Sequence, residues 1–414
     1  MSKGAELPFP KGILWGTATS AHQIEGNNKN SDWWDWETNK PERRKYPLEP
    51  SGIACDSYNR YEEDFDLCKR LNNNVVRISI EWARIEPEQG KFDKKEIEHY
   101  RQVLKAAKDR GLKTFATLHH FTNPLWFSKK GGWTRFDSPK LFAKYAEVCA
   151  REFSDLVDFF ITINEPEVLV GAGFLAGFFY PGKHNLVLAT LAEINLYRAH
   201  NAAYDAIKDL TETPTGIVKN IQWFDTDEKK SMFLDKWIAR LTIFLLCDLF
   251  MFLIKGRLDF LGLNYYFTNR FVWLRKRNAN DRVSDLGWWI HPEGLENVLL
   301  RLKKYKVPIY ITENGLADAD DSKRTEFIHD HLVAAWNAIQ AGTDLRGYMH
   351  WSLLDNYEWH EGYRPQFGLV EIDRENNLQR KPRPSFHYYA DICKNNRVVK
   401  GSYDKKSAQK NSLV

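Results

Sequence analysis

The chain of 414 residues contains 43 % hydrophobic and 28 % charged residues, and its formal net charge is +4. These proportions are typical of a globular protein and exclude a wholly disordered chain or a small disulfide-built scaffold. Over this length, a charge of +4 is too weak to indicate binding to nucleic acid or to an anionic membrane. Aromatic residues make up 14 %, including 15 Trp, which fits either a large core or flat apolar platforms for a ligand such as a sugar.

The cysteines are widely spaced and include no C-x-x-C pair, which argues against both a zinc ribbon and a disulfide framework. Reduced, buried thiols are the favoured interpretation for all of them: Cys55, Cys68, Cys149, Cys247 and Cys393. The first residues, Met1–Glu6, lack the apolar run of a secretory signal. We therefore expect a cytoplasmic protein.

Short apolar runs alternate with amphipathic stretches along most of the chain. The expected strands are residues 13–18, 75–80, 114–119, 159–164, 215–218, 260–264, 309–312 and 347–352. The expected helices include residues 58–71, 94–110, 139–153, 189–210, 293–304 and 322–341. Strands that alternate with helices in this way predict an α/β fold, a parallel sheet closed into a (β/α)₈ TIM barrel.

No Gly/Ser-rich or Pro-rich linker divides the chain, so residues 1–399 are predicted to form a single barrel domain and the polar residues 400–414 a disordered tail. One apolar segment, Trp237–Ile254, is interrupted by Arg240 and Asp248 and is too short between charges to span a bilayer. We interpret this segment as a buried helix, with a self-association or membrane-surface patch as the alternative. No membrane span is expected.

Polar residues stand where several of the predicted strands end. They are Arg77, Glu81-Trp82, His119-His120, Asn164-Glu165, Asn264-Tyr265-Tyr266, Glu313-Asn314 and His350-Trp351. In a TIM barrel the active site lies at the C-terminal ends of the strands. We therefore expect these residues to converge on one pocket.

Glu165 and Glu313 each close a strongly apolar strand, where an isolated carboxylate is unfavourable unless it is paired or functional. One such glutamate is commonly half of a structural ion pair. Two of them, with Arg, His, Asn and Tyr at the other strand ends, favour catalysis. Glycoside hydrolysis needs this pair, because one carboxyl group donates a proton while the other attacks the sugar or activates water.

Several longer motifs carry a family resemblance. They are L-W-G-T-A-T-S-A-H-Q-I-E-G at residues 14–26, T-I-N-E-P at 162–166, G-L-N-Y-Y at 262–266, I-T-E-N-G at 311–315 and H-W-S-L-L-D-N-Y-E-W at 350–359. In this order, over roughly residues 8–395, the chain resembles the family 1 glycoside hydrolases, the β-glucosidase and β-glycosidase family. The resemblance implies a single catalytic barrel that needs no metal and no cofactor.

The resemblance also implies a reaction. It is retaining hydrolysis of terminal, non-reducing β-D-glucosyl residues, with galactosyl or fucosyl residues as further candidates, by double displacement through a covalent glycosyl-enzyme. Glu165 matches the family's acid/base and Glu313 its nucleophile. Arg77 and Tyr266 match groups that keep the nucleophile ionised, and Asn164 matches a group beside the acid.

The residues that match the family's sugar-binding set are Gln23, His120, Asn164, Trp351, Glu358 and Trp359, and Trp288 matches an aromatic of the leaving-group site. Asn164 would hold the 2-hydroxyl, and Trp351 would lie under the ring. The implied partner is a small oligosaccharide or an aryl or alkyl β-glycoside, with no nucleic acid. A homo-oligomer is left open.

Some positions depart from the family's pattern. Phe121 stands where Trp is more common, His360 replaces a small residue, and Pro365-Gln366 stand in place of a basic pair. The chain is also short between Trp223 and Phe260. These departures leave the outer wall of the site and its leaving-group preference open.

Other functions have weaker support. Residues 171–176 fit the dinucleotide motif G-x-G-x-x-[GA], with Glu193 further on, but residues 177–182 are typical of a loop rather than of the required helix. A catalytically inactive sugar-binding protein would lose one of the two glutamates. A phospho-β-glycosidase needs cations at the distal sugar hydroxyl, where this chain has Glu358.

Overall fold

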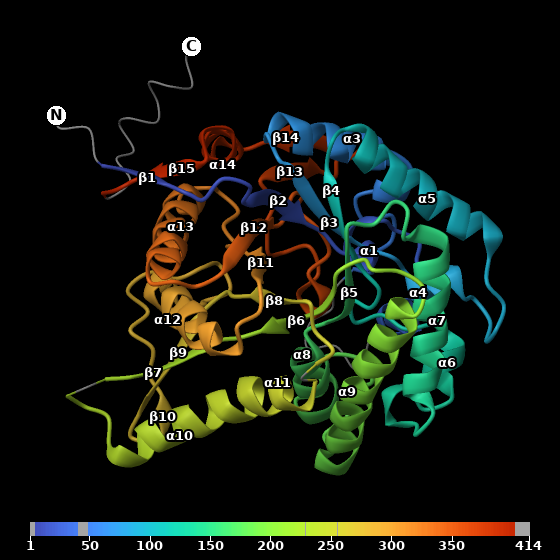
Figure 1. Ribbon diagram of the computed structural model, residues 1–414, viewed down its shortest axis with the longest axis horizontal. Helices are drawn as coiled ribbons and strands as arrows, with labels where there is room; N and C mark the ends of the chain where they lie inside the picture. Colours follow the sequence, from blue (N-terminus) through green and yellow to red (C-terminus); the bar gives the residue numbers. More distant parts are fainter. Residues whose placement is uncertain (1–4, 40–48, 228, 255, 402–414) are drawn as a thin grey trace.

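Eight parallel strands close into a barrel at the centre of the molecule, which confirms the predicted (β/α)₈ fold (Figure 1). The computed structural model describes residues 5–39, 49–227, 229–254 and 256–401. The strands follow one another around the barrel as β2 (Leu14–Ala18), β3 (Val75–Ser79), β4 (Lys113–Thr117), β5 (Phe159–Asn164), β6 (Thr215–Asn220), β8 (Phe260–Asn264), β11 (Ile309–Asn314) and β12 (Leu345–Trp351). Strand β12 pairs with β2 and completes the closure.

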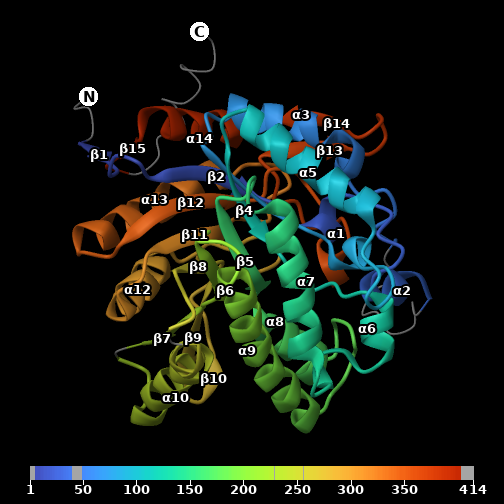
Figure 2. The same ribbon diagram turned by 45° about the vertical axis from the view of Figure 1, so that its right-hand side comes forward.

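Helices surround the barrel because parallel strands need crossover connections, which place helices on the outer face of the sheet (Figure 2). The long helices are α3 (Ser57–Arg70), α5 (Lys94–Asp109), α7 (Ser138–Phe153), α9 (Leu186–Lys208), α12 (Pro292–Leu302), α13 (Arg324–Gln340) and α14 (Pro384–Asn395). The expected helices match six of these to within three residues at each end. Side-chain caps explain some of the starts: Asp93 accepts from the Lys95 backbone N–H at 2.8 Å, and Asn185 from that of Leu188 at 3.0 Å.

Short elements lie in the connections between the strands and the long helices. The helices are α1 (Ala21–Ile24), α2 (Asp32–Asn39), α4 (Trp82–Ile85), α6 (Leu125–Lys129) and α8 (Pro166–Val170), with 3₁₀ turns at Gly132–Thr134, Lys303–Tyr305 and Trp359–Glu361 and a π-helical turn at Gly171–Leu175. Small sheets pair β1 (Glu6–Pro8) with β15 (Arg397–Val399), β13 (Val370–Asp373) with β14 (Gln379–Pro382), and β7 (Trp223–Thr226) with β9 (Thr268–Val272) and β10 (Arg275–Lys276). The β1–β15 pair joins the two ends of the described chain. Most of the predicted tail lies outside the described residues.

Side chains alternate between the inside and the outside of the barrel, as the two-residue period of a strand requires. On β3, Val75 belongs to the interior cluster while Val76 and Ile78 belong to the layer under the helices. The rings of Phe115, Phe159, Phe260 and Tyr310 pack together inside the barrel; those of Phe115 and Phe159 stack with centroids 4.1 Å apart. These rings come early in their strands and fill the N-terminal end of the barrel. Polar groups are left to the other end.

The segment Trp237–Ile254 is helical, but the prediction that it is buried is wrong. It forms α10 (Phe233–Ile243), a π-helical turn (Phe244–Asp248) and α11 (Leu249–Leu253). Phe250 and Ile254 are fully buried, whereas Trp237 is 52 % and Phe252 73 % exposed. Hydrophobicity alone predicted burial, but no second layer of the described chain covers the outer side of these helices.

Four cysteines whose side chains are described, Cys55, Cys68, Cys149 and Cys393, are free and buried, in agreement with the expected thiols. Burial raises the pKa of the Cys55 thiol to about 12. The side chain of Cys247 lies outside the described residues. Within the described chain, none of the helices is long and apolar enough to cross a membrane.

Candidate active site

The two predicted catalytic glutamates both lie at the C-terminal end of the barrel and are nearly inaccessible to solvent. Glu165 directly follows β5 and is 5 % exposed; Glu313 is the penultimate residue of β11 and is 3 % exposed. Glu165 adopts a left-handed backbone conformation, with φ of 45°, and its N–H donates to the carbonyl of Val218 at 2.9 Å. Such a conformation is unfavourable for a non-glycine residue, and residues of this kind cluster at functional sites.

Both carboxylate oxygens of Glu313 accept a short, strong hydrogen bond. Arg77 Nη1 donates to Oε1 at 2.5 Å, and the Tyr266 hydroxyl donates to Oε2 at 2.5 Å. Arg77 is fully buried, on the strand β3, so this ion pair is shielded from water. Packing explains why position 315 of the T-E-N-G motif is a glycine. A Cβ on Gly315 would lie 1.7 Å from the carbonyl oxygen of Trp351.

Two asparagine side chains connect the surroundings of the two glutamates. Arg77 Nη2 donates to Asn164 Oδ1 at 2.6 Å. Asn264 Nδ2 lies 3.2 Å from the same Asn164 oxygen and donates to Glu165 Oε1 at 2.5 Å. The predicted residues Arg77, Asn164, Glu165, Tyr266 and Glu313 are thus brought together in one hydrogen-bonded group, which also contains Asn264.

The two carboxyl groups have different electrostatic surroundings. Burial and the negative charge of Glu313 raise the pKa of Glu165 well above its ordinary value, although the Asn264 amide and the Arg77 charge oppose that rise. Burial also raises the pKa of Glu313, but the Arg77 guanidinium and the Tyr266 hydroxyl oppose that rise. Glu313 is therefore the carboxyl group that ionises first, and Glu165 is the one that holds its proton to higher pH.

A buried ion pair behind Glu165 was not predicted. Lys219 Nζ lies 2.6 Å from Glu167 Oε2, and the Lys219 side chain is only 1 % exposed. Glu167 also accepts from the Asn220 backbone N–H, and Asn220 Nδ2 donates to Glu165 Oε1 at 3.2 Å. The signal in the sequence was a lysine and an asparagine that end the fifth barrel strand and an acidic residue two positions after Glu165.

Gln23 and Glu358, two predicted sugar-binding residues, contact each other. Gln23 Nε2 donates to Glu358 Oε2 at 3.3 Å and to the Tyr357 carbonyl at 3.0 Å, while the Ser20 hydroxyl donates to Gln23 Oε1 at 2.8 Å. Burial and the charge of Glu313 raise the pKa of Glu358 to about 8. Glu358 therefore belongs to the same electrostatic site as the nucleophile candidate.

Three stacked rings form an apolar wall. The ring of His120 lies nearly parallel to those of Trp351 and Trp359, with centroids 5.9 and 6.1 Å away. His120 Nε2 accepts from Asn164 Nδ2 at 3.3 Å, and burial together with the Arg77 charge lowers the pKa of this imidazole well below its ordinary value. The imidazole is therefore neutral. Its Nδ1 has no hydrogen-bond partner within the described part of the chain.

Trp288, which was predicted to contact the leaving group, packs beside Tyr266, the hydroxyl donor to Glu313. Its ring centroid lies 5.6 Å from that of Tyr266 and 5.0 Å from that of Phe267. The structure thus places every predicted site residue around one end of the barrel.

Several polar residues at strand ends do not enter this pocket, so the expectation that all of them converge is wrong. His119 Nε2 lies 3.0 Å from Asn123 Oδ1 and its ring packs on Trp133, in the helical layer. His350 is likewise buried near Tyr389 of α14. On β12 the two-residue period explains the difference, because Met349 and Trp351 face inward and His350 between them faces the helices. His119 lies beyond the end of β4 at Thr117, where the backbone bends and the alternation no longer holds, so His120 rather than His119 faces the pocket.

The residues that depart from the family pattern pack against, or form hydrogen bonds with, neighbouring side chains. Phe121 lies against Trp359 and Phe179 with ring centroids 5.1 and 5.6 Å away, and His360 lies 4.5 Å from the Phe178 ring. Gln366 Oε1 accepts from Arg383 Nη2 at 2.8 Å. The G-x-G-x-x-[GA] motif continues helix α8 as a π-helical turn and does not follow a strand, so it lacks the context of a dinucleotide site.

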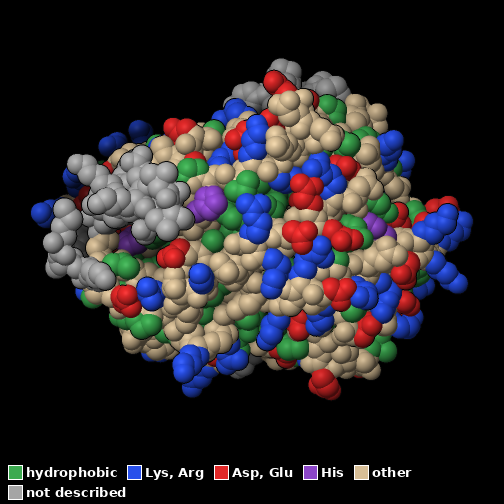
Figure 3. All heavy atoms as spheres, turned by 90° about the horizontal axis from the view of Figure 1, so that it is seen from above, with side chains coloured by type: hydrophobic (Ala, Val, Ile, Leu, Met, Phe, Trp, Pro, Cys, Tyr) green, Lys and Arg blue, Asp and Glu red, His purple; other side chains and the backbone are tan. Residues whose placement is uncertain are grey.

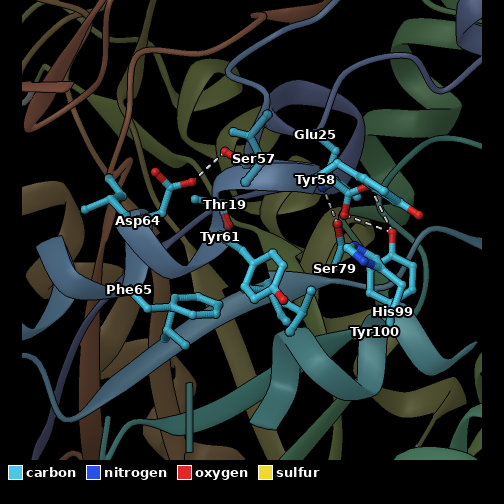
Figure 4. A pocket seen from close by; sticks show the side chains of 16 residues that line it. Thr19, Glu25, Ser57, Tyr58, Tyr61, Asp64, Phe65, Ser79, His99 and Tyr100 are labelled. Atoms are coloured by element: carbon cyan, nitrogen blue, oxygen red, sulfur yellow. Dashed lines mark hydrogen bonds between the residues drawn. The ribbon is translucent and has the colours of Figure 1, made fainter. Parts of the chain in front are cut away.

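A separate cavity of about 40 Å³ lies between the barrel and helices α3 and α5 (Figure 4). Tyr100 donates to Glu25 Oε1 at 2.9 Å on one side of it, and Ser79 Oγ accepts from the Ala21 backbone N–H at 2.6 Å. Burial raises the pKa of Glu25 to about 7. These hydrogen bonds hold α1, the helix that carries Gln23, against the barrel, so the residues around the cavity support the site from behind.

Among the described residues there is no group of three or more His, Cys, Asp and Glu that could hold a metal ion.

Comparison with known proteins agrees with this geometry. The sequence profile of "Glycosyl hydrolase family 1" matches residues 5–236 and 246–398. The curated "Beta-glucosidase A" of Thermotoga maritima is 32 % identical and is matched over 94 % of this chain and 98 % of its own length. The "Beta-galactosidase" of Pyrococcus woesei is 31 % identical over 95 % and 98 % of the two chains. Among solved structures, the β-glycosidase from Pyrococcus horikoshii is 36 % identical, covers 99 % of each chain and has a TM-score of 0.87.

Proposed function

The chain belongs to glycosyl hydrolase family 1, and from that premise we propose how its residues act on a β-glucoside. The protein is a retaining β-glycosidase. We propose that its substrates carry a terminal, non-reducing β-D-glucosyl residue on a small oligosaccharide or on an aryl or alkyl group, and that galactosyl residues are also accepted. The names of the relatives support this range, because they include both glucosidases and galactosidases.

In the first step, Glu313 attacks the anomeric carbon and forms a covalent ester. The bond to the leaving oxygen breaks as Glu165 donates its proton to that oxygen, so the aglycone departs as a neutral alcohol. Arg77 and Tyr266 keep Glu313 ionised and oriented until the attack. Trp288 contacts the departing group.

In the second step, Glu165 is a carboxylate and takes a proton from water. The activated water attacks the anomeric carbon and releases Glu313. Two inversions restore the β configuration. The same side chain thus serves as acid and then as base.

The observation that carries this assignment is the asymmetry of the two carboxyl groups. Each oxygen of Glu313 has a strong donor, one of them a buried cation, whereas the donors to Glu165 within the described chain are the neutral amides of Asn264 and Asn220. An acid must hold a proton at neutral pH and a nucleophile must not. Opposite roles for these residues require this difference in surroundings.

We assign the glycone contacts to the residues around Gln23. Gln23 and Glu358 would bond hydroxyls at the far side of the sugar, and Asn164 the 2-hydroxyl, where a hydrogen bond strengthens in the transition state. His120 has a neutral ring with an unbonded Nδ1, which suits a hydroxyl partner. Trp351 and Trp359 would pack against the apolar face of the ring.

We further propose that residues 1–399 act as one catalytic domain in the cytoplasm. The pairing of Glu6 with Val399 supports the first point, since it joins two segments that lie almost 400 positions apart in the sequence. The free buried thiols support the second, because disulfides are rare in that compartment. A homo-oligomer remains a prediction.

The direct test is a panel of kcat/KM values for nitrophenyl β-glucoside, β-galactoside, β-fucoside and α-glucoside, with cellobiose and lactose. We expect turnover of the β-glucoside, none of the α-glucoside, and a first product of β configuration by NMR. Glu313→Gln should abolish this turnover, because an amide cannot form the glycosyl ester. An α-configured first product would overturn the proposal.

A further inference from the structure

A band of exposed apolar side chains covers the outer side of α10, the following π-helical turn, α11 and the turn between β9 and β10. We call this band the α10–α11 face. Its largest members are Phe233, Trp237, Phe244, Phe252, Trp273 and Leu274, which range from 48 % to 82 % exposed. The helices run along one edge of the molecule, outside the ring of helices that encloses the barrel (Figures 1 and 2).

The α10–α11 face is held in place from behind. The backbone N–H groups of Trp273 and Leu274 donate to the Asp235 carboxylate at 3.0 and 2.7 Å, so the β9–β10 turn is bonded to the start of α10. At the other end, the buried Phe250 ring lies 4.6 Å from that of Tyr197 and 3.9 Å from Lys219 Nζ. The outer apolar residues therefore sit on a fixed platform whose inner side is already packed.

This face is comparable in size to the largest apolar patch of a typical monomer. The largest apolar patch of a typical monomer is about 300–600 Å². A large aromatic side chain can bury roughly 150–250 Å², and Phe233, Trp237, Phe252 and Trp273 are each more than half exposed. These four alone approach that range, and the leucines of the same helices add to it. The family profile does not match residues 237–245, which form part of this face.

The exposed charged side chains of the described residues 229–254 and 268–277 are all basic. Its exposed charged residues are Lys229, Lys230, Lys236 and Arg240 beside α10, and Arg275, Lys276 and Arg277 at the β9–β10 turn. Both acids of these segments have partners. Asp235 is buried in the first turn of α10 and accepts from the Met232 backbone N–H at 2.7 Å, and Asp248 pairs with Lys304 at 2.6 Å. Within the described residues 229–254 and 268–277, no carboxylate is exposed. On the opposite side of the molecule, acidic and basic side chains are interspersed (Figure 3).

We propose that the α10–α11 face docks the protein on an anionic lipid surface. Trp and Phe side chains enter the boundary between headgroups and acyl chains, and the surrounding Lys and Arg side chains bind lipid phosphates, as in amphipathic helices that lie in the plane of a membrane. A second copy is the less suitable occupant. A two-fold contact through this face would bring the basic residues of one copy close to those of the other, and the described residues 229–254 and 268–277 offer no exposed carboxylate to pair them.

The test is flotation of the full chain with phosphatidylcholine vesicles that contain either no anionic lipid or about 30 % phosphatidylglycerol. We expect the protein to float with the anionic vesicles and to stay at the bottom with the neutral ones. The triple variant Phe233→Ser, Phe252→Ser, Trp273→Ser and the double variant Lys236→Glu, Arg240→Glu should each lower the bound fraction on the order of tenfold.

Matched controls lie elsewhere on the surface. Lys94→Glu with Lys95→Glu, at the start of α5, makes the same charge change, and Leu210→Ser with Val399→Ser removes exposed apolar groups at other sites. These controls should float like the wild type. All variants should hydrolyse a soluble aryl β-glucoside at the wild-type rate, which establishes that they fold.

Three results would overturn the proposal. They are failure of the wild type to float with anionic vesicles, flotation that neither variant reduces, and flotation that the controls reduce equally. A wild type that sediments as a dimer, does not float, and becomes monomeric in the triple variant would assign the face to a second copy instead.

Discussion

The side-chain amide of Asn264 donates to Glu165 Oε1 at 2.5 Å, and its own oxygen accepts from the Thr312 hydroxyl at 2.7 Å. The Asn264 nitrogen also donates to Asn164 Oδ1, an oxygen that accepts from Arg77, and this contact fixes which end of the amide faces the acid. Asn264 therefore always presents a donor to Glu165 and opposes the rise of its pKa. The asparagine of the G-L-N-Y-Y motif thus adjusts the proton affinity of the acid without itself carrying charge.

Asn264→Ala should shift the pH–rate profile to higher pH. The Asn264 amide lowers the pKa values of both Glu165 and Glu313, so its loss raises both. The acidic limb follows the nucleophile and the basic limb follows the acid, so both should move upward. The loss of a hydrogen-bond donor to a buried carboxyl group should also lower kcat/KM, at a cost of about 1–3 kcal/mol of transition-state binding. A profile that keeps both limbs in place would assign Asn264 a structural role only.

Arg77→Met should raise the pKa of Glu313 further, because the buried carboxylate loses its only cation partner among the described residues. Since Glu313 must be ionised to attack, the acidic limb of the kcat/KM profile should move to higher pH by about one to three units. Arg77→Lys keeps the charge and should move it less. Circular dichroism checks that both variants fold. An unmoved limb in Arg77→Met would show that this arginine does not control the nucleophile.

The Lys219–Glu167 pair should behave as a unit. Lys219→Met alone leaves Glu167 buried without its cation and should destabilise the protein by about 3–5 kcal/mol. Adding Glu167→Gln should restore most of that stability in denaturant unfolding. It also removes a negative charge that raises the pKa of Glu165, so the basic limb of the double variant should move to lower pH. A double variant no more stable than Lys219→Met, or an unmoved basic limb, would contradict this coupling.

Glu358→Ala should weaken glycosides that carry intact 4- and 6-hydroxyls far more than their deoxy analogues. The loss of a buried acceptor for two hydroxyls should cost about 2–4 kcal/mol of transition-state binding. Glu361→Ala, a change at the neighbouring acid, which pairs with Arg364, is the matched control and should affect both substrates equally. Equal losses in Glu358→Ala would mean that Glu358 does not contact those hydroxyls.

The barrel could be predicted because each strand is a short apolar run and each connection carries a helical pattern. The site could be located from the same pattern, because Glu165 and Glu313 stand at the ends of such apolar runs. Position along a strand does not show which face a side chain occupies, however, and His119 and His350 were wrongly expected in the pocket. The two-residue alternation of β12 separates His350 from Trp351, but β4 ends at Thr117, and the backbone bend after it sets the directions of His119 and His120.

Tertiary packing decided what local patterns could not. Trp237 and Phe252 are as hydrophobic as core residues, and nothing in the segment itself indicates that its outer side has no covering layer. Lys219 posed the opposite problem, since a lysine in a strand is normally expected at the surface. Its burial depends on Glu167, which is distant in sequence and adjacent only after folding.

The central claim, that Glu165 is the acid/base and Glu313 the nucleophile, is tested most directly by Glu165→Ala with dinitrophenyl β-glucoside and azide. This substrate hardly needs protonation of its leaving group, so the glycosyl-enzyme should form and accumulate, and KM should fall. Azide needs no base, so it should attack the intermediate, restore turnover and give β-glucosyl azide after two inversions. α-Glucosyl azide would mean direct displacement, and no rescue in a folded variant that still binds sugar would remove the role assigned to Glu165.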